Sequence, residues 1–449
     1  MAKHGWNLAC VVVLAAASAS TVRAADAPVR RLPLAEYQDK MKAGWLGQMI
    51  GVSWGGPTEW RYIKVIMPED KVPAWHEGMA NDAFGQDDLY VEMTFLRSLE
   101  QYGYEVSAKQ AGIDFANSKY NLWAANRAGR DNLRKGIAPP DSGHPQFSEW
   151  PDAIDYQIEA DFSGLVAPGM PNTAIALGEK FGHIINYGDG VYGGQFIGGL
   201  YAEAFFETDP VKIVEAGLKC IPKESQYAEM VRDVLAQYKA DPKDWQKAFA
   251  FVNDKYNRPE YARKTTLNRD RNIDAKINGA FVLVGILYGQ RDLDKTAILS
   301  LRCGQDSDCN PSSAVGVIAT TYGFSKLPEK YRQGLDETKL FNHTEYNFPM
   351  LIKACEKVAR EALAKAGGQV EKDSAGQEVL VIPVVAPKLG ALEQSGKPGP
   401  VSNSKYTPEE MAKMGAKAGK AGATAPSPSA TAPAPGTAAP SPSMTAPSQ

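Results

Sequence analysis

The chain has 449 residues, of which 44% are hydrophobic, so it is long enough to bury a large core. Its formal net charge is −3, and it carries neither a basic stripe nor an RNA-binding aromatic motif, which argues against nucleic-acid and anionic-membrane partners. These bulk properties predict a large globular protein and leave its oligomeric state open.

The first residues predict export. Lys3 supplies a positive charge, residues 8–17 form an apolar run, and Val22-Arg23-Ala24 fits a small-residue cleavage site. The apolar run is too short to span a bilayer as a stable helix. We therefore predict a cleavable signal peptide over residues 1–24, no stable membrane insertion, and a secreted or periplasmic protein.

The cysteines that remain after this cleavage are Cys220, Cys303, Cys309 and Cys355. An even number in an oxidising compartment permits two disulfides, for which three pairings are possible. Buried thiols are the alternative, and the sequence leaves both open.

Apolar side chains at helical spacing predict a first helix over residues 33–52, after an exposed leader at residues 25–31. Glycines weaken an isolated helix, so several of them in one helix indicate close packing of its backbone against a neighbour. The glycines in this helix are Gly44, Gly47 and Gly51.

An aromatic loop is predicted to follow at residues 53–62. Loops on rigid scaffolds often carry binding groups, so Trp54 and Glu59 are candidate substrate-binding residues, with core packing as the alternative for the tryptophan. Residues 51–55 also fit the G-x-S-x-G nucleophile elbow of serine hydrolases. That motif needs a preceding strand and a following helix, which this sequence does not predict, so Ser53 as an esterase nucleophile is a remote alternative.

A second helix is predicted from Asp87 to Tyr102, with Gly103 ending it and Gln86-Asp87-Asp88 opening it. Another helix is predicted near residues 107–125. The acidic segment at residues 153–162 then carries Glu159 and Asp161 close to a turn. Acidic groups at a helix end are poorly placed for the helix dipole, so these carboxyl groups are either functional or a solvated surface end.

A glycine-rich stretch at residues 187–199 contains Tyr192 and runs into a helix that reaches Phe206. Such a start can cradle a phosphate, but close contact between two helices is the favoured interpretation. Since strands are almost absent up to residue 366, the body is predicted to be nearly all helical. Further helices are predicted at residues 211–220, 226–239, 242–256, 276–288 and 350–366.

An acidic turn at residues 304–313 carries Asp306 and Asp308, and a helix of small residues follows it. Asn310 can cap this helix, and Pro311 suits its first turn. Carboxyl groups in such a turn either cap the helix or hold a hard cation.

The upstream Asp87-Asp88 pair raises the second possibility, because the two pairs together supply four carboxyl groups with no histidine or thiolate cluster beside them. All-oxygen donors suit Mg²⁺, Ca²⁺ or Mn²⁺ rather than zinc. If the pairs converge, their repulsion requires one or two ions. Two separate helix caps are the alternative.

The pattern changes after Gly367. Residues 369–372 and 377–382 flank a turn and predict a β-hairpin. Alanine, proline and serine dominate the end of the chain, which predicts disorder. The predicted organisation after the signal peptide is a helical domain at residues 33–366, a small extension with the hairpin at residues 367–412, and a disordered tail at residues 413–449.

The order of these motifs resembles the ADP-ribosylglycohydrolase family of the dinitrogenase-reductase-activating type. The resemblance is carried by residues 44–56, 86–88, 159–161, 190–204 and 305–309 with the helix that follows. It implies an all-α, orthogonal multi-helix bundle with a binuclear Mg²⁺ site. Two of the implied ligands stand where the family usually has hydroxyl residues. The metal-binding residues that the resemblance implies are Gln86, Asp87, Asp88, Asp306, Asp308 and Cys309.

The resemblance also implies cleavage of a glycosidic bond at an anomeric carbon, with the metals gripping sugar hydroxyls and orienting water. For an exported relative we predict a metal-dependent hydrolase of an ADP-ribosyl-like or carbohydrate glycoside. The predicted general base is Asp161 or Glu159. The alternative is a secreted carbohydrate-binding protein that kept the bundle and lost catalysis. The residues predicted to contact the substrate are Trp54, Glu59 and Tyr192.

Overall fold

The structure is a computed structural model that describes residue 1, residues 28–268 and residues 271–415. The predicted signal peptide lies outside the described residues except for residue 1. The predicted tail lies outside them beyond residue 415. Among the described residues, no helix combines the length and apolar character needed to cross a bilayer.

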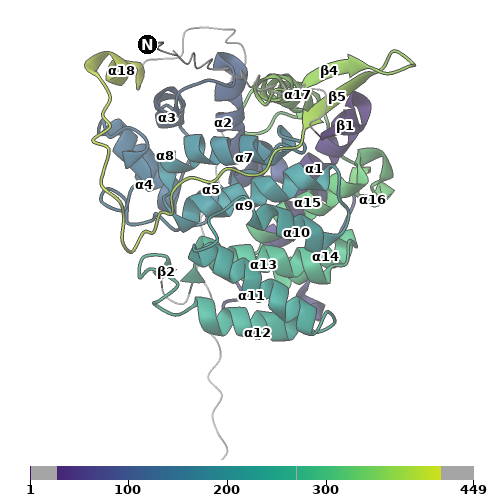
Figure 1. The fold of residues 1–449 in the computed structure, drawn as a ribbon. Coiled ribbons are helices and arrows are strands. Elements are labelled where there is room, and N and C mark those ends of the chain that lie inside the picture. Colours follow the sequence, from purple (N-terminus) through teal and green to yellow (C-terminus); the bar gives the residue numbers. More distant parts are fainter. Residues whose placement is uncertain (2–27, 269–270, 416–449) are drawn as a thin grey trace, which may run out of the picture. The chain divides into compact units, whose positions relative to one another are not determined.

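Helices make up most of the regular structure of the described chain, and the predicted all-α class is confirmed (Figure 1). Short 3-10 and π turns connect some of them, among them η2 (Gly56–Thr58) and η4 (Met79–Gly85). The α-helices are α1 (Leu34–Gly55), α2 (Asp87–Tyr102), α3 (Ala108–Ala116), α4 (Ala124–Arg134), α5 (Asp155–Ile158), α6 (Asp161–Leu165), α7 (Pro171–Leu177), α8 (His183–Ile185), α9 (Asp189–Ala204), α10 (Pro210–Leu218), α11 (Gln226–Ala240), α12 (Trp245–Tyr256), α13 (Ala275–Tyr288), α14 (Leu293–Arg302), α15 (Cys309–Tyr322), α16 (Glu329–Arg332), α17 (Phe348–Lys365) and α18 (Pro408–Lys413).

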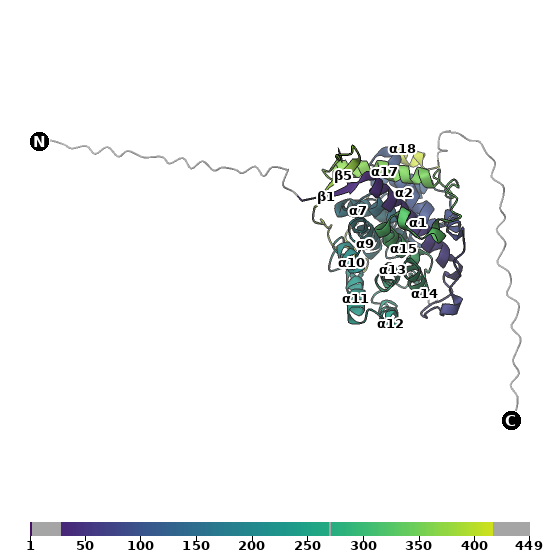
Figure 2. The ribbon, with the colours of Figure 1, turned by 90° about the vertical axis from the view of Figure 1, so that its right-hand side faces the viewer.

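Helices α1 and α15 pack backbone against backbone at the centre of the bundle, and α15 also packs on α13 (Figures 1 and 2). A Cβ atom added to Gly51 would lie 2.2 Å from the carbonyl oxygen of Pro311, and one added to Gly55 would lie 1.9 Å from that of Ser307. Real Cβ atoms do not approach so closely, so only glycine fits at these positions. The close packing predicted from the glycines is therefore present.

Two predicted helix boundaries are wrong. Helix α1 continues through Gly55, so Ser53 and Trp54 lie in its last turn and not in a loop. The helix predicted near residues 107–125 is two helices, because α3 ends at Ala116 and α4 begins at Ala124. The segment between them buries its own apolar side chains, including Tyr120 and Leu122, so the apolar pattern carried no sign of the break.

A small antiparallel sheet joins the two ends of the described chain. The predicted hairpin is present as β4 (Gln369–Lys372) and β5 (Glu378–Pro383). Strand β1 (Val29–Pro33) pairs with the free edge of β5, giving the order β1-β5-β4. Residues 29–31 of the predicted leader belong to this strand, where Val29 and Arg31 are exposed as predicted and Leu32, just after the leader, is buried. A second, two-stranded sheet is formed by β2 (Leu267–Asn268) and β3 (Arg271–Asn272).

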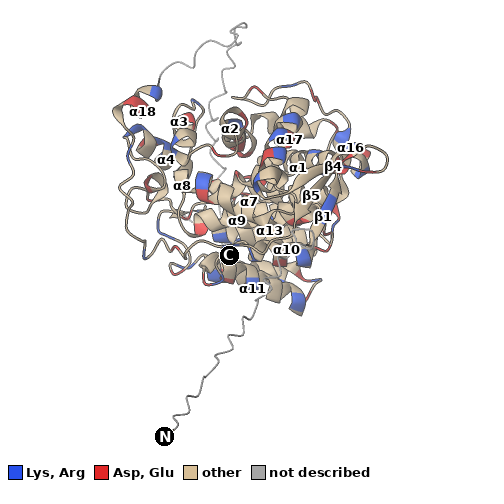
Figure 3. Cartoon of the chain, turned by 45° about the horizontal axis from the view of Figure 1, so that its top comes forward, with Lys and Arg blue, Asp and Glu red and all other residues tan. Residues whose placement is uncertain are grey.

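The four cysteines in the described chain are buried free thiols, so the disulfide alternative is set aside. On the side of the molecule drawn in Figure 3, lysine and arginine are interspersed with aspartate and glutamate along the outer helices. This distribution agrees with the absence of a basic stripe in the sequence.

The segment at residues 384–407 follows the sheet and is fixed to the bundle by buried polar contacts. The Glu393 carboxylate lies 2.9 Å from Nε2 of His183, and it also accepts from the backbone N–H of Gly188. Further on, the backbone N–H groups of Ser402 and Ser404 donate to Asp141. The segment is therefore part of the packed body and not a separate extension.

The His183–Glu393 pair predicts a pH-dependent contribution to stability. Burial alone would lower the pKa of His183, but Glu393 and Glu179 raise it to about 9. The pKa of Glu393 is lowered, because the contacts with His183 outweigh the effect of burial. The contribution of His183 to the free energy of unfolding is therefore complete below its unfolded pKa of about 6.5, and it is lost as the pH rises through about 9. The contribution of Glu393 has the opposite dependence, since it is lost as the pH falls below the unfolded pKa of about 4.3.

We expect His183→Gln to lower the free energy of unfolding by roughly 3 kcal/mol near pH 6, and by little near pH 10, since each pKa unit corresponds to about 1.4 kcal/mol. Urea unfolding at several pH values measures this difference. The exposed His76→Gln serves as the control and should change stability little at any pH. A His183→Gln effect that is the same at pH 6 and pH 10 would contradict the assignment.

Candidate functional site

A cavity of about 940 Å³ opens at the ends of several helices that are distant in sequence. The start of α2, the start of α15 and the loop after η2 meet at one side of it, and residues around α4, α5 and β3 form the other walls. Carboxyl groups and aromatic rings dominate its lining. The acidic residues of the lining are Glu59, Asp87, Asp131, Asp155, Asp306 and Asp308, and the aromatic ones are Trp60, Tyr90, Trp123 and Trp150.

The two acidic pairs meet at this cavity. The Cys309 thiol at the start of α15 donates to Oδ1 of Asp88 in α2 across 3.0 Å. One donor atom from each of Asp306, Asp308 and Cys309 lies within 4.8 Å of the others. Asp88 is buried just behind Asp87, which lines the cavity. Four carboxyl groups from opposite parts of the chain are thus gathered in one small volume.

The turn before α15 is held in place by backbone contacts with the loop after η2. Gly304 and Gln305 both adopt left-handed conformations, with φ of 73° and 58°. The N–H of Gln305 donates to the carbonyl oxygen of Tyr62, and the N–H of Trp60 donates to that of Gln305. The Thr58 and Ser307 hydroxyls are 2.8 Å apart. These bonds fix the directions of Asp306 and Asp308 before any ligand binds.

Helix capping does not account for these carboxyl groups. No side chain caps α15, whose N-cap residue is Asp308, and none caps α2, whose N-cap residue is Gln86. Asn310 was expected to cap α15, but it lies inside the first turn and donates to the side-chain oxygen of Asn278. The carboxyl groups are therefore not engaged in the alternative role that the sequence allowed.

The site gathers several acidic groups, and the basic residues on the same cavity wall are Arg127 and Arg271. Burial raises the pKa of Asp88 and of Asp306 well above their usual range, with further increases from neighbouring carboxylates. Burial and the charges of Glu59 and Asp87 raise the pKa of Asp308 to about 7. No lysine or arginine in the described chain forms an ion pair with the four aspartates at residues 87, 88, 306 and 308. Such crowding is stable only when protons or a cation reduce the repulsion.

The donor set fits a hard divalent cation. Oδ2 of Asp88 and Oδ1 of Asp308 are buried and have no hydrogen-bond partner. Carboxylate oxygens are the ligands that Mg²⁺, Ca²⁺ and Mn²⁺ prefer. Burial raises the pKa of the Cys309 thiol, and Asp306 and Asp308 raise it further, so the group is a protonated donor to Asp88. Gln86 lies on the cavity wall beside the acidic pair.

Glu159 and Asp161 lie deeper than predicted. Each is only 1% exposed, and neither lines the cavity, so the solvated-end alternative is wrong and direct contact with a substrate is blocked. Glu159 accepts a hydrogen bond from the side chain of Asn126, which does line the cavity. Asp161 accepts one from the Ser313 hydroxyl at 3.2 Å.

Of the three residues predicted to contact the substrate, only Glu59 lies on the cavity wall. The Trp54 indole donates to the carbonyl oxygen of Pro73 and packs on Trp75, because the longer α1 carries it into the core. The Tyr192 hydroxyl accepts from the backbone N–H of Glu393, so it holds the C-terminal segment instead. Ser53 is buried inside a helix, which is not the strand-to-helix context of a nucleophile elbow.

Asp155 is the site residue that the sequence did not identify. It lies on the cavity wall, where Oδ1 accepts from the backbone N–H of Asn126 at 2.8 Å and Oδ2 has no partner. Burial raises its pKa to about 7. Its spacing from Glu159, four residues on, was the only sequence signal. The aromatic residues Trp123 and Trp150 of the cavity carried none.

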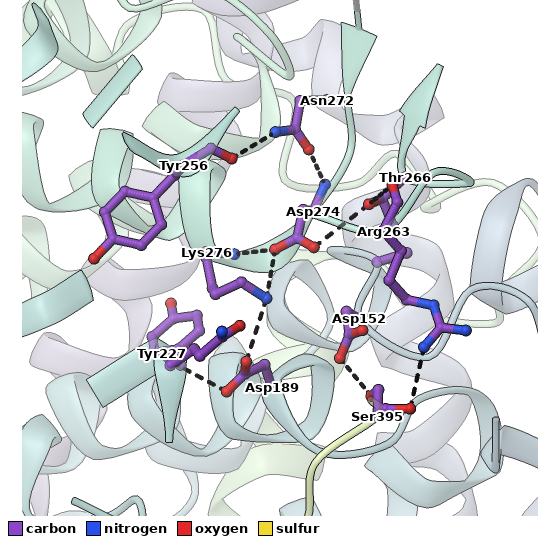
Figure 4. Close-up of polar contacts among 12 residues, drawn as sticks. Asp152, Asp189, Tyr227, Tyr256, Arg263, Thr266, Asn272, Asp274, Lys276 and Ser395 are labelled. Atoms are coloured by element: carbon purple, nitrogen blue, oxygen red, sulfur yellow. Dashed lines mark hydrogen bonds and ion pairs between the residues drawn. The ribbon is translucent and has the colours of Figure 1, made fainter. Parts of the chain in front are cut away.

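A buried ionic network supports the wall behind the cavity (Figure 4). Lys276 is 2% exposed, and its Nζ lies 3.1 Å from Asp274 and 3.2 Å from Asp189. The Thr266 hydroxyl donates to Asp274, and Thr266 itself lines the cavity. The same region binds the C-terminal segment, since the Ser395 hydroxyl donates to Asp152 at 2.6 Å. The network therefore fixes the wall segment to the bundle.

The described chain is a helical bundle that gathers several buried carboxyl groups at one cavity. The model of the ADP-ribosylglycohydrolase family matches residues 33–368, and the chain belongs to this family. The family points to glycohydrolase activity.

A solved structure titled "ADP-ribosylglycohydrolase-related protein complex" is similar to this chain with 16% sequence identity and a TM-score of 0.47. The match covers 72% of this chain and 99% of the other. No curated protein matches the chain.

The ionic network generates a prediction about stability. Lys276→Met should lower the free energy of unfolding by about 3–5 kcal/mol, because it leaves Asp189 and Asp274 buried without their cationic partner. Denaturant unfolding measures the loss. The control is Lys239→Met, which breaks an ion pair with Glu215 at the surface and should cost less than about 1 kcal/mol. Equal losses in the two variants would show that the network contributes nothing specific.

Proposed function

We propose that this protein hydrolyses a glycosidic bond in the cavity, by attack of water at the anomeric carbon, and that it requires a hard divalent cation. The convergence of Asp87, Asp88, Asp306 and Asp308, with buried oxygens that lack partners, is the observation that carries this proposal. The family supports the glycohydrolase class. The substrate we propose is a small glycoside, ADP-ribosyl-like or carbohydrate, met outside the cytoplasm.

The cation would be held by the four aspartates, and Mg²⁺ is the ion we propose, with Ca²⁺ or Mn²⁺ able to replace it. When bound, it supplies charge that orients sugar hydroxyls and water. Gln86 offers a carbonyl oxygen at the same wall. Cys309 is assigned a different role, since its thiol is a poor ligand for such ions and already donates to Asp88.

The remaining chemistry falls to side chains on the cavity wall. We assign the general base to Asp155, because it lies on the cavity wall, has a raised pKa and keeps one carboxylate oxygen without a hydrogen-bond partner. This assignment replaces Asp161 and Glu159, which do not line the cavity. A second acid on the cavity wall protonates the leaving group, which balances the proton that Asp155 takes from water. The Asn126 backbone and side chain hold Asp155 and Glu159 in position. The rings of Trp60, Trp123 and Trp150 suit the apolar faces of sugars, and Glu59 suits their hydroxyls.

Chelation tests the cation. We expect turnover of a panel of glycosides to be abolished by EDTA and restored by Mg²⁺. We also expect Asp308→Asn to lower kcat/KM at least about 100-fold, since removal of groups that only support metal ligands already costs 10–100-fold. The exposed Asp70→Asn is the control. Glycoside binding without turnover would favour the non-catalytic alternative. Turnover that persists in EDTA would contradict the proposed requirement for a cation.

Substitution of the base tests the second assignment. Asp155→Asn should lower kcat by about 10²–10⁴-fold with a small change in KM. The base must be deprotonated, so wild-type kcat should fall as the pH drops below the pKa of Asp155, at about 7 or lower when the cation is bound. Asp131→Asn, on the same wall, is the matched control and should retain activity within about tenfold. A larger loss in Asp161→Asn or Glu159→Gln than in Asp155→Asn would return the role to those residues.

A further inference from the structure

A second group of buried carboxyl groups lies deeper in the bundle. Glu92 of α2 is 0% exposed and Asp161 of α6 is 1% exposed. Each uses one carboxylate oxygen in a hydrogen bond: Oε2 of Glu92 accepts from the backbone N–H of Phe162 at 2.9 Å, and Oδ2 of Asp161 accepts from Ser313. The other oxygen of each group, Oε1 of Glu92 and Oδ1 of Asp161, has no partner.

Nothing in the described chain neutralises these two groups. Neither forms an ion pair with a lysine, arginine or histidine of the described residues. Glu92 accepts from the backbone N–H of Phe162, the residue after Asp161, so the two carboxyl groups are close neighbours, and the charge of Asp161 raises the pKa of Glu92. Two charged groups buried together without a counter-charge would cost several kcal/mol each. Protons or a bound cation must therefore reduce the repulsion between them.

An independent polar side chain points to the same place. Gln48 of α1 is fully buried, and neither its amide nitrogen nor its amide oxygen has a partner. A Cβ atom added to Gly316 of α15 would lie 3.0 Å from Cγ of Gln48 and 1.8 Å from the Tyr201 hydroxyl, so these two side chains approach one another. The Tyr201 hydroxyl is buried too, and it faces the Asp161 carboxyl group.

The helix register places Asp161 beside them. One turn before Gln48, a Cβ atom added to Gly44 would contact Leu165 of α6 and Thr320 of α15. Four residues from these positions, one helical turn away, lie Gln48 in α1, Asp161 in α6 and Gly316 in α15. These three residues therefore face one another. Burial raises the pKa of Asp161, and the Tyr201 hydroxyl opposes this rise, which again places the two groups together.

We infer that Glu92, Asp161, Gln48 and Tyr201 form a second cation site, separate from the aspartates at the cavity. Its donors are all oxygen atoms if the Gln48 amide turns its oxygen inward, and its two carboxylates match a hard divalent ion, Mg²⁺ or Ca²⁺. The site is enclosed by α1, α2, α6, α9 and α15, so the ion is incorporated as the bundle forms and holds these helices together. Its role is structural, and it does not depend on the proposed reaction.

Metal analysis of the full chain tests this inference. The background is Asp306→Asn/Asp308→Asn, which removes the cavity site. After equilibration with Mg²⁺ or Ca²⁺ and gel filtration in metal-free buffer, we expect mass spectrometry to find about one ion per chain in this background. Adding Glu92→Gln or Gln48→Met should reduce the bound metal at least about tenfold. Asp114→Asn, a buried carboxyl group satisfied by Ser98, is the control and should leave it unchanged.

The outcomes separate the two sites. Loss of metal from the background alone would overturn the second site without affecting the cavity proposal. Retention of metal in both added variants would overturn it too. A folded Glu92→Gln protein with greater stability and equal metal content would also overturn it, because a shared proton would then lie between Glu92 and Asp161 instead of an ion. If Glu92→Gln fails to fold, Gln48→Met decides, since it removes donors without changing charge or much volume.

Discussion

Repulsion between buried carboxyl groups is the constraint on which the rest of this structure depends. Asp87, Asp88, Asp306 and Asp308 are brought together by two helices whose starts meet at one cavity. Desolvation and mutual repulsion both disfavour their charged forms. A fold that nevertheless gathers them must either keep them protonated or supply positive charge. Within the described residues these four carboxyl groups form no ion pair and two of their buried oxygens have no hydrogen-bond partner, which is the basis of the proposed cation.

The glycine contacts between α1 and α15 hold these carboxyl groups together despite their repulsion. They let the two backbones touch, which places the turn before α15 against the end of α1 and the loop that follows it. The carboxyl groups are then held by rigid elements, and Lys276 stabilises the opposite wall through its own aspartates. Rigid placement on both sides keeps the site geometry from relaxing to relieve its electrostatic cost.

Local sequence signals predicted the all-helical class, the start of α2, the hairpin and the close packing of α1, because each of these depends on spacing or composition within one segment. They could not predict how deeply individual side chains are buried. Glu159 and Asp161 have the sequence of a surface helix end, yet other helices cover them. Trp54 has the sequence of a loop aromatic, yet one extra helical turn carries it into the core. Asp155 becomes a site residue only through the segments opposite it, and β1 exists only because the distant β5 offers it an edge.

The pairing of β1 with β5 has a consequence for how the protein matures. Val29 lies opposite Pro383, so the earliest strand to emerge from the ribosome has no partner until nearly the whole domain has been made. Contacts between such distant segments form slowly, and an unpaired edge is prone to wrong associations while it waits. Folding therefore includes a late closing step in which β5 joins β1. With the export that residues 1–24 predict, this closing step would take place after the chain has crossed the membrane.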